Sequence, residues 1–160
     1  MTEGWIVNAS PLILFARIAR LDLIESLAVG VVVPASVLEE VRAGRDSDRT
    51  VDTALDWALP FCRKDIEVPA TVQNWDIGPG ESQVLAQCLR TTRWAVLDDR
   101  MARRCANAHG IPVIGSLGIV LRAKNRGLIE HAKPWVCKLR DAGMYLDEAT
   151  IRRVLSTVAE

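Results

Sequence analysis

The sequence has no long hydrophobic run, although 49% of its 160 residues are apolar. The longest apolar stretches, such as Leu12 to Phe15 and Val29 to Val33, are far shorter than the roughly 20 residues that a membrane-spanning helix needs. No basic segment followed by an apolar segment and a small-residue cleavage site comes after Met1. These absences predict a protein without a membrane partner or export signal, located in the cytoplasm.

Cysteine and histidine are also scarce. The four cysteines form no Cys-x-x-Cys pair, and the two histidines have no Glu or Cys at ligand spacing, which argues against a zinc site or a redox pair. We expect the cysteines to be buried small hydrophobic side chains. They are Cys62, Cys88, Cys105 and Cys137.

The chain has no excess charge of either sign, because 20 basic residues balance 20 acidic ones. The balance hides a segregation along the chain. Residues 100–140 hold nine Lys or Arg against one acid, whereas residues 41–99 hold ten acids against seven bases. An acidic pocket edged by positive charge would suit a metal-dependent enzyme that acts on a polyanion, and the alternative is that cationic helices only solvate their outer faces.

Short β-branched runs alternate with segments of helical spacing, and no repeat or long linker interrupts them. Strands are predicted at 5–7, 29–33, 65–68, 94–97 and 111–114. Helices are predicted at 11–18, 21–27, 35–42, 50–59, 81–89, 100–109, 116–126, 131–141 and 147–158. This alternation predicts an α/β domain with a central parallel sheet covered on both faces. Because 17.6 kDa leaves no room for two cores, we expect a single domain over 1–160, with a core at 1–127 and a C-terminal helical extension at 128–160.

Polar residues follow the predicted strands, and acids begin or occupy the helices beside them. In a parallel sheet the carboxyl ends of the strands meet at one edge, where ligands bind. Clustered oxygen atoms from separate segments are the ligands that Mg²⁺ or Mn²⁺ prefers. The residues concerned are Asn8, Ser10, Glu39, Glu40, Glu81, Asp98, Asp99 and Ser116.

Five sequence segments, in their order and spacing, resemble the PIN-domain family of nucleases. They are VNASPLI at 7–13, VPASVLEEV at 33–41, GESQ at 80–83, LDDR at 97–100 and VIGSLG at 113–118. The resemblance covers nearly the whole chain and is closest to a branch with an added helical C-terminal region. It implies a three-layer α/β/α fold with additional C-terminal helices.

The resemblance also implies an acidic metal site. Its four positions fall on Asn8, Glu40, Glu81 and Asp99, so that Asn8 stands where the family has an aspartate. An amide oxygen can coordinate Mg²⁺ or Mn²⁺ but adds no negative charge, so the site would hold about three formal charges instead of four. Weaker metal affinity is therefore expected.

Such a site implies a metal-dependent endoribonuclease that hydrolyses RNA phosphodiester bonds. Ser10 and Ser116 would contact phosphate or metal-bound water, Arg100 and Arg103 would neutralise phosphate, and the basic later segment would follow the RNA backbone. The family includes the VapC-like toxins of type II toxin–antitoxin pairs, which implies a small antitoxin partner and a homodimer. The candidates for the dimer interface are Trp57, Trp75 and Trp135.

Each site residue also has a purely structural interpretation. Asp99 can be the N-cap of the next helix, Glu81 can favour a positive helix end, and Asn8 with Ser10 can cap the first helix. Glu40 can be a solvated acid.

Two other functions therefore stay open. One is a PIN-fold module, weakened at Asn8, that binds RNA or protein without cleaving it. The other is a receiver-type phosphoacceptor, suggested by Asp98, Asp99 and Ser116. This second function is disfavoured because no acid follows the first strand and no lysine follows the last.

Overall fold

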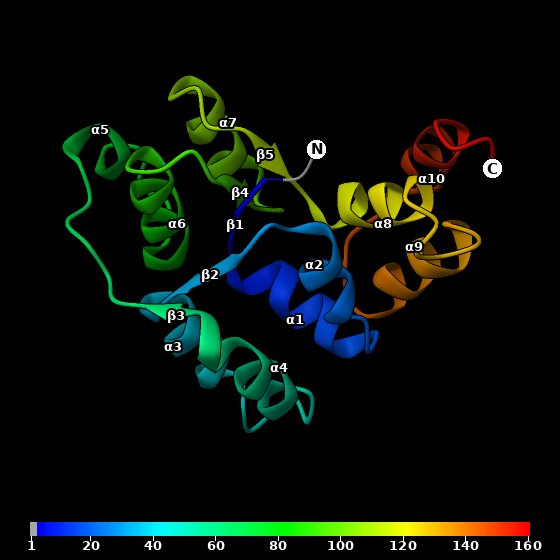
Figure 1. Cartoon of the computed structure of the whole chain (residues 1–160), viewed down its shortest axis with the longest axis horizontal. Coiled ribbons are helices and arrows are strands. Elements are labelled where there is room, and N and C mark those ends of the chain that lie inside the picture. Colours follow the sequence, from blue (N-terminus) through cyan, green and yellow to red (C-terminus); the bar gives the residue numbers. More distant parts are fainter. Residues whose placement is uncertain (1–2) are drawn as a thin grey trace.

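Five short parallel strands form the centre of the fold (Figure 1). The structure, a computed structural model, describes residues 3–160. The strands are β1 (Trp5–Val7), β2 (Val31–Pro34), β3 (Cys62–Arg63), β4 (Trp94–Val96) and β5 (Val113–Ile114), in the spatial order β3-β2-β1-β4-β5. β1 is the middle strand, fully buried, with Ile6 paired to Val32 on one side and to Ala95 on the other. The residue that follows β1 therefore lies at the centre of the sheet edge where ligands bind.

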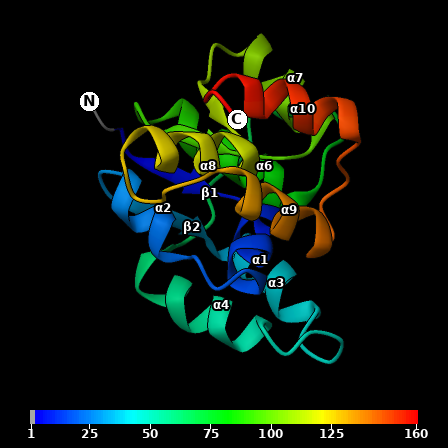
Figure 2. The same cartoon turned by 90° about the vertical axis from the view of Figure 1, so that its right-hand side faces the viewer.

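Helices cover both faces of the sheet. The α-helices are α1 (Ala9–Arg17), α2 (Asp22–Leu27), α3 (Ala35–Ala43), α4 (Val51–Ala58), α5 (Ala70–Gln73), α6 (Pro79–Leu89), α7 (Arg100–Ala108), α8 (Ser116–Asn125), α9 (Lys133–Asp141) and α10 (Glu148–Ser156), with a 3₁₀ turn η1 at Leu59–Phe61. The connections β1–α1–β2 and β3–α6–β4 cross the sheet in opposite directions, so right-handed crossovers place α1 and α6 on opposite faces. Figure 2 shows α8 and α9, with α1 and α2, in front of the strands. The predicted three-layer α/β class with a central parallel sheet is confirmed.

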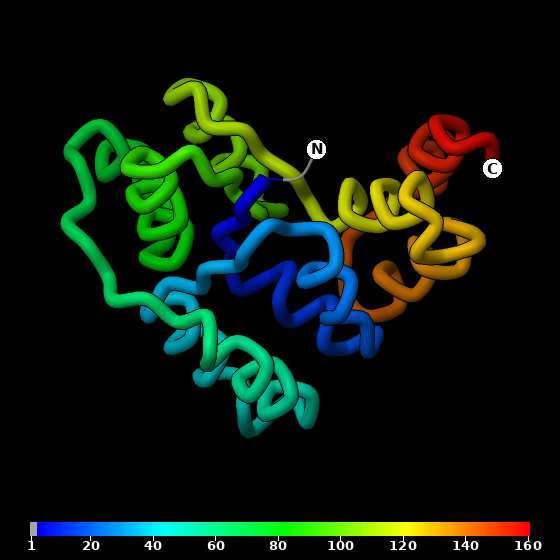
Figure 3. Tube along the Cα trace, viewed as in Figure 1, coloured from blue at the N-terminus to red at the C-terminus, as the bar shows by residue number. Residues whose placement is uncertain are grey.

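The C-terminal helices share the hydrophobic core with the sheet. Buried Val136 and Leu139 of α9 and Ile151 of α10 belong to the same cluster as the strand residues. The chain trace returns toward α1 after α9 (Figure 3), where Arg17 Nη1 donates to the Ala142 carbonyl oxygen at 2.7 Å. None of the helices in residues 3–160 is long and apolar enough to cross a membrane.

The strand predicted at 65–68 is wrong. The third strand of the chain is Cys62–Arg63, and the following segment has no regular structure until α5, a helix that the sequence did not predict. In place of a neighbouring strand, the side chain of Gln83 pairs with Ile66: its Oε1 accepts the Ile66 amide hydrogen at 3.0 Å and its Nε2 donates to the Ile66 carbonyl at 2.6 Å. A helix side chain has thus taken the role of a strand partner.

The expected burial of the cysteines holds for two of the four. Cys88 and Cys105 are buried, and burial raises the pKa of the Cys88 thiol to about 12. Cys137 is half-buried, and Cys62 is exposed because it lies on the edge strand β3. The prediction was wrong for Cys62, because an edge strand leaves one side of its residues open to solvent.

Candidate active site

A cleft of about 540 Å³ opens at the carboxyl ends of β1 and β4, beside the first turn of α6. It brings together four acids from three separate segments of the chain. Its lining consists of Ser10, Ile13, Leu14, Arg17, Glu40, Glu81, Asp98, Asp99, Gly143, Met144 and Tyr145. Five residues that the sequence singled out therefore line one cleft, namely Ser10 and the four acids, and Asn8 lies buried next to it.

Asn8 occupies the N-cap position of α1, yet its side chain makes no capping hydrogen bond. Its backbone N–H donates to the Val96 carbonyl oxygen at 3.1 Å, which fixes the residue against β4. Asn8 is only 1% exposed, and its Oδ1 atom has no hydrogen-bond partner among residues 3–160. Leaving a buried polar atom unpaired costs about 1–3 kcal/mol, so this oxygen is suited to a donor or cation that is not part of the chain.

The unpaired oxygen of Asn8 faces a carboxylate. Oδ1 of Asn8 and Oε1 of Glu40 lie 3.2 Å and 3.3 Å from the position that a Cβ at Gly80 would take. The two oxygens are therefore separated by no more than the sum of these distances. Gly80, in the first turn of α6, adds no side chain at this point, which also lies 3.4 Å from Cγ2 of Val37.

Glu40 and Glu81 influence each other. Burial, and secondarily the charge of Glu81, raises the pKa of the Glu40 carboxyl. Glu81 itself turns back over Gly78 at the N-terminal end of α6, its Oε2 lying 2.5 Å from the position of a Cβ at Gly78. Negative charge is favoured there by the helix dipole, so the structural interpretation of Glu81 is also satisfied. A divalent cation between the two carboxylates would relieve their repulsion.

The two aspartates after β4 have different surroundings. Asp99 caps α7 through Oδ2, which accepts the Ala102 amide hydrogen at 2.8 Å, and this leaves Oδ1 for the cleft. Both oxygens of Asp98 accept from Ser116, one from its N–H at 2.7 Å and the other from its hydroxyl at 2.6 Å. Ser116 is fully buried, so its hydroxyl orients Asp98 and does not line the cleft.

Two predicted phosphate-binding arginines follow Asp99 on α7. Arg100 and Arg103 are both exposed. Arg103 extends back toward β5: its Nη1 lies 2.7 Å from the Cβ position of Gly115, and Asp98 Oδ1 lies 3.1 Å from the same position. The guanidinium of Arg103 thus lies near Asp98, one of the acids that line the cleft.

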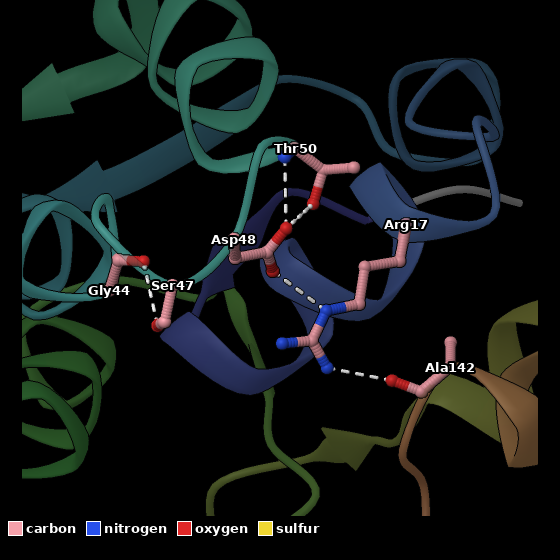
Figure 4. A network of polar contacts seen from close by, with 6 residues as sticks. All are labelled: Arg17, Gly44, Ser47, Asp48, Thr50 and Ala142. Carbon is pink, nitrogen blue, oxygen red and sulfur yellow. Dashed lines mark hydrogen bonds and ion pairs between the residues drawn. The ribbon is translucent and has the colours of Figure 1, made fainter.

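Arg17 is a cleft residue that the sequence analysis missed. Its Nε donates to Asp48 Oδ2 at 2.8 Å while its Nη1 binds Ala142, so it joins α1 to two distant loops (Figure 4). Asp48 also accepts the Thr50 amide and hydroxyl hydrogens, and these bonds, followed by Arg17, lower the pKa of Asp48 to about 2. No local sequence pattern predicts these two contacts, because Asp48 and Ala142 lie 31 and 125 positions after Arg17 in the chain.

The resemblance to PIN domains implies Mg²⁺ or Mn²⁺, and both ions bind to oxygen ligands. Within residues 3–160, no three His, Cys, Asp or Glu side chains are close enough to hold a metal ion by themselves. Mg²⁺ commonly binds to one or two carboxylates and keeps several water molecules. The unpaired amide oxygen of Asn8 and the carboxylate oxygen of Glu40, both within 3.3 Å of the Gly80 Cβ position, fit that mode of binding.

A family model described as a PIN domain, DUF3368, matches residues 4–160. No curated protein matches the chain significantly. The matched range includes every residue of the cleft and the C-terminal helices α9 and α10.

Proposed function

Because the chain belongs to the PIN-domain family, whose members are generally nucleases, we propose that it is a metal-dependent endoribonuclease that hydrolyses phosphodiester bonds of RNA. The observation that carries the proposal is the unpaired, buried Oδ1 of Asn8 beside the Glu40 carboxylate, next to a cleft that Glu81 and Asp99 also line. An arrangement that served only the fold would pair this oxygen.

Asn8, Glu40, Glu81 and Asp99 would hold Mg²⁺ or Mn²⁺, in part through the water molecules that such an ion keeps, because no three acids are close enough to hold it by themselves within residues 3–160. When bound, such an ion supplies activation of water and neutralisation of charge on the phosphate. The carboxylates of Glu40, Glu81 and Asp99 contribute negative charge, and the amide of Asn8 contributes a neutral oxygen. The site therefore attracts a divalent cation less strongly than four carboxylates would.

The remaining polar residues act on the substrate or on the acids. Exposed Ser10 and the guanidinium groups of Arg100 and Arg103 bind phosphate oxygens along the cleft edge. Ser116 acts through Asp98. It donates two hydrogen bonds to the Asp98 carboxylate, and these bonds fix the orientation of Asp98 beside Asp99.

The proposal extends to a cytoplasmic toxin that pairs with a small antitoxin protein and forms a homodimer. It rests on the family resemblance, since toxins of this kind are PIN domains. Trp57, Trp75 and Trp135 are half-buried and available in part for an interface. A gene for a small DNA-binding protein immediately upstream would support the pairing, and a mass of about 17.6 kDa by light scattering would contradict the dimer.

The test is RNA cleavage with Mn²⁺ and with EDTA, using Glu40→Gln and a matched control. Glu39→Gln changes the neighbouring residue on α3, which is exposed and paired with Arg42. We expect Mn²⁺-dependent cleavage by the wild type, a loss on the order of 100-fold in Glu40→Gln and little change in Glu39→Gln. Equal losses in both variants, or cleavage that persists in EDTA, would contradict the proposal.

A second candidate is a PIN-fold module that binds RNA or a protein without cleavage. It is favoured by the neutral Asn8 and by the lack of a three-acid cluster within residues 3–160. A ligand that binds the native state alone raises the melting temperature. A melting temperature that rises with Mn²⁺, together with RNA cleavage, supports the nuclease. RNA binding with neither a rise in melting temperature nor cleavage supports the binding module.

A further inference from the structure

Tyr145 is the only tyrosine of the chain and, at 93% exposure, the most exposed large hydrophobic side chain among residues 3–160. It lies in the loop between α9 and α10 and lines the same cleft as Glu40, Glu81 and Asp99. We propose that Tyr145 stacks on a nucleobase of single-stranded RNA whose phosphate lies at the acidic part of the cleft. This inference rests on the proposed function, because it names the form of RNA that the site takes.

The backbone around Tyr145 is held in place, so the ring is presented to solvent by structure. The neighbouring residues Met144 and Leu146 pack against the hydrophobic core. The start of the loop is fixed by the hydrogen bond from Arg17 to the Ala142 carbonyl (Figure 4). An aromatic ring on a fixed backbone loses little conformational freedom when a ligand covers it.

The surroundings of the ring indicate a nucleobase as its partner. The cleft holds oxygen atoms suited to a cation that binds phosphate, and the guanidinium of Arg103 lies near Asp98, one of its acids. A nucleotide presents its base a few ångströms from its phosphate, and aromatic side chains bind the faces of unpaired bases with little dependence on sequence. In a duplex these faces are already stacked on each other, so the ring selects single strands.

The experiment uses the full chain with 3-fluorotyrosine in place of tyrosine, which gives a single ¹⁹F resonance because Tyr145 is unique. An oligoadenylate of about ten nucleotides is added in EDTA, so that binding is measured apart from cleavage. We expect the resonance to shift with the oligoadenylate and to stay unchanged with the corresponding duplex or with an abasic strand of the same length.

Affinities of substituted proteins complete the test. Tyr145→Ala should bind the oligoadenylate on the order of 10-fold more weakly than the wild type, and Tyr145→Phe should bind equally well. Val29→Ala is the control, because Val29 is an exposed apolar residue just before β2. It therefore lies at the amino ends of the strands, and the cleft lies at their carboxyl ends. It should bind as the wild type does.

Several results would overturn the inference. Equal affinity of Tyr145→Ala and wild type, or an equal shift with the abasic strand, would mean that the ring contacts no base. A resonance that moves with protein concentration alone would mean that a second copy covers the ring. Failure of the proposed function is separate: if Tyr145→Ala loses binding while the wild type cleaves no RNA in Mn²⁺, the stacking role stands and the nuclease proposal falls.

Discussion

The buried Oδ1 of Asn8 and the Oε1 of Glu40 lie on the same side of Gly80, 3.2 and 3.3 Å from the position that a Cβ there would take. This relationship gives a physical reason for an amide at this position. An aspartate at position 8 would place a buried negative charge near the carboxyl of Glu40. The pKa of that carboxyl is already raised by partial burial and by the charge of Glu81. The amide keeps an oxygen in place without adding to the repulsion.

Asn8→Asp should tighten Mn²⁺ binding and destabilise the metal-free protein. An added anionic ligand in this buried position should strengthen binding by about 1–3 kcal/mol, and the same charge without metal faces Glu40 unpaired. We expect a lower melting temperature in EDTA that Mn²⁺ restores, together with some increase in RNA cleavage. Calorimetric titration with Mn²⁺ and thermal melts measure the two effects.

Ser10→Asp is the matched control for Asn8→Asp. It adds the same charge to the same cleft, but at an exposed position where water screens it. Its effects on Mn²⁺ affinity and melting temperature should be smaller. If both variants change affinity equally, the gain comes from the general field of the cleft and Asn8 is not a ligand.

Gly80→Ala should weaken metal binding while leaving the fold intact. Alanine is favoured over glycine inside a helix by about 1 kcal/mol, which offsets the close approach of the new methyl group to Val37. The methyl would occupy the space between Asn8 and Glu40, at 3.2 and 3.3 Å from their oxygens. The rise in melting temperature that Mn²⁺ produces should fall, whereas Gly44→Ala, where a Cβ meets only ordinary contacts, should behave as the wild type. An undiminished response in Gly80→Ala would place the ion elsewhere.

Asp99→Asn should abolish RNA cleavage and lower Mn²⁺ affinity without unfolding α7. Asparagine is as good an N-cap as aspartate, so the hydrogen bond to Ala102 is retained while the charge is lost. Asp147→Asn makes the same change at the N-cap of α10, where the side chain accepts from Thr150, and should leave cleavage unchanged. Circular dichroism confirms the fold, and titration with Mn²⁺ compares the affinities. Equal cleavage by both variants would show that Asp99 only caps the helix.

The residues that were predictable from the sequence are those whose position depends on local pattern. Asn8 directly follows β1 and Asp99 comes three residues after the end of β4, and parallel strands bring such residues to one edge of the sheet. The unpaired side chain of Asn8 was not predictable. Its position before α1 favours a capping hydrogen bond, and the side chain does not make that bond within the described residues. Arg17 and Tyr145 enter the cleft through packing of the C-terminal helices, which no short-range pattern records.

Acid should destabilise the protein through Asp48, and the direction follows from its hydrogen bonds. The Thr50 hydroxyl and amide, followed by Arg17, hold the pKa of Asp48 at about 2, below its ordinary value of 3.8. A carboxyl whose pKa is lowered on folding stabilises the native state above its unfolded pKa, and this contribution is lost as the pH falls through its native pKa. The free energy of unfolding should therefore decrease between about pH 4 and pH 2 as Asp48 takes up its proton. Urea titrations across this range should show a shallower decrease in Asp48→Asn and an intermediate one in Thr50→Val, which keeps the Arg17 contact. Parallel pH curves for all three proteins would mean that the network around Arg17 does not stabilise the fold through the charge of Asp48.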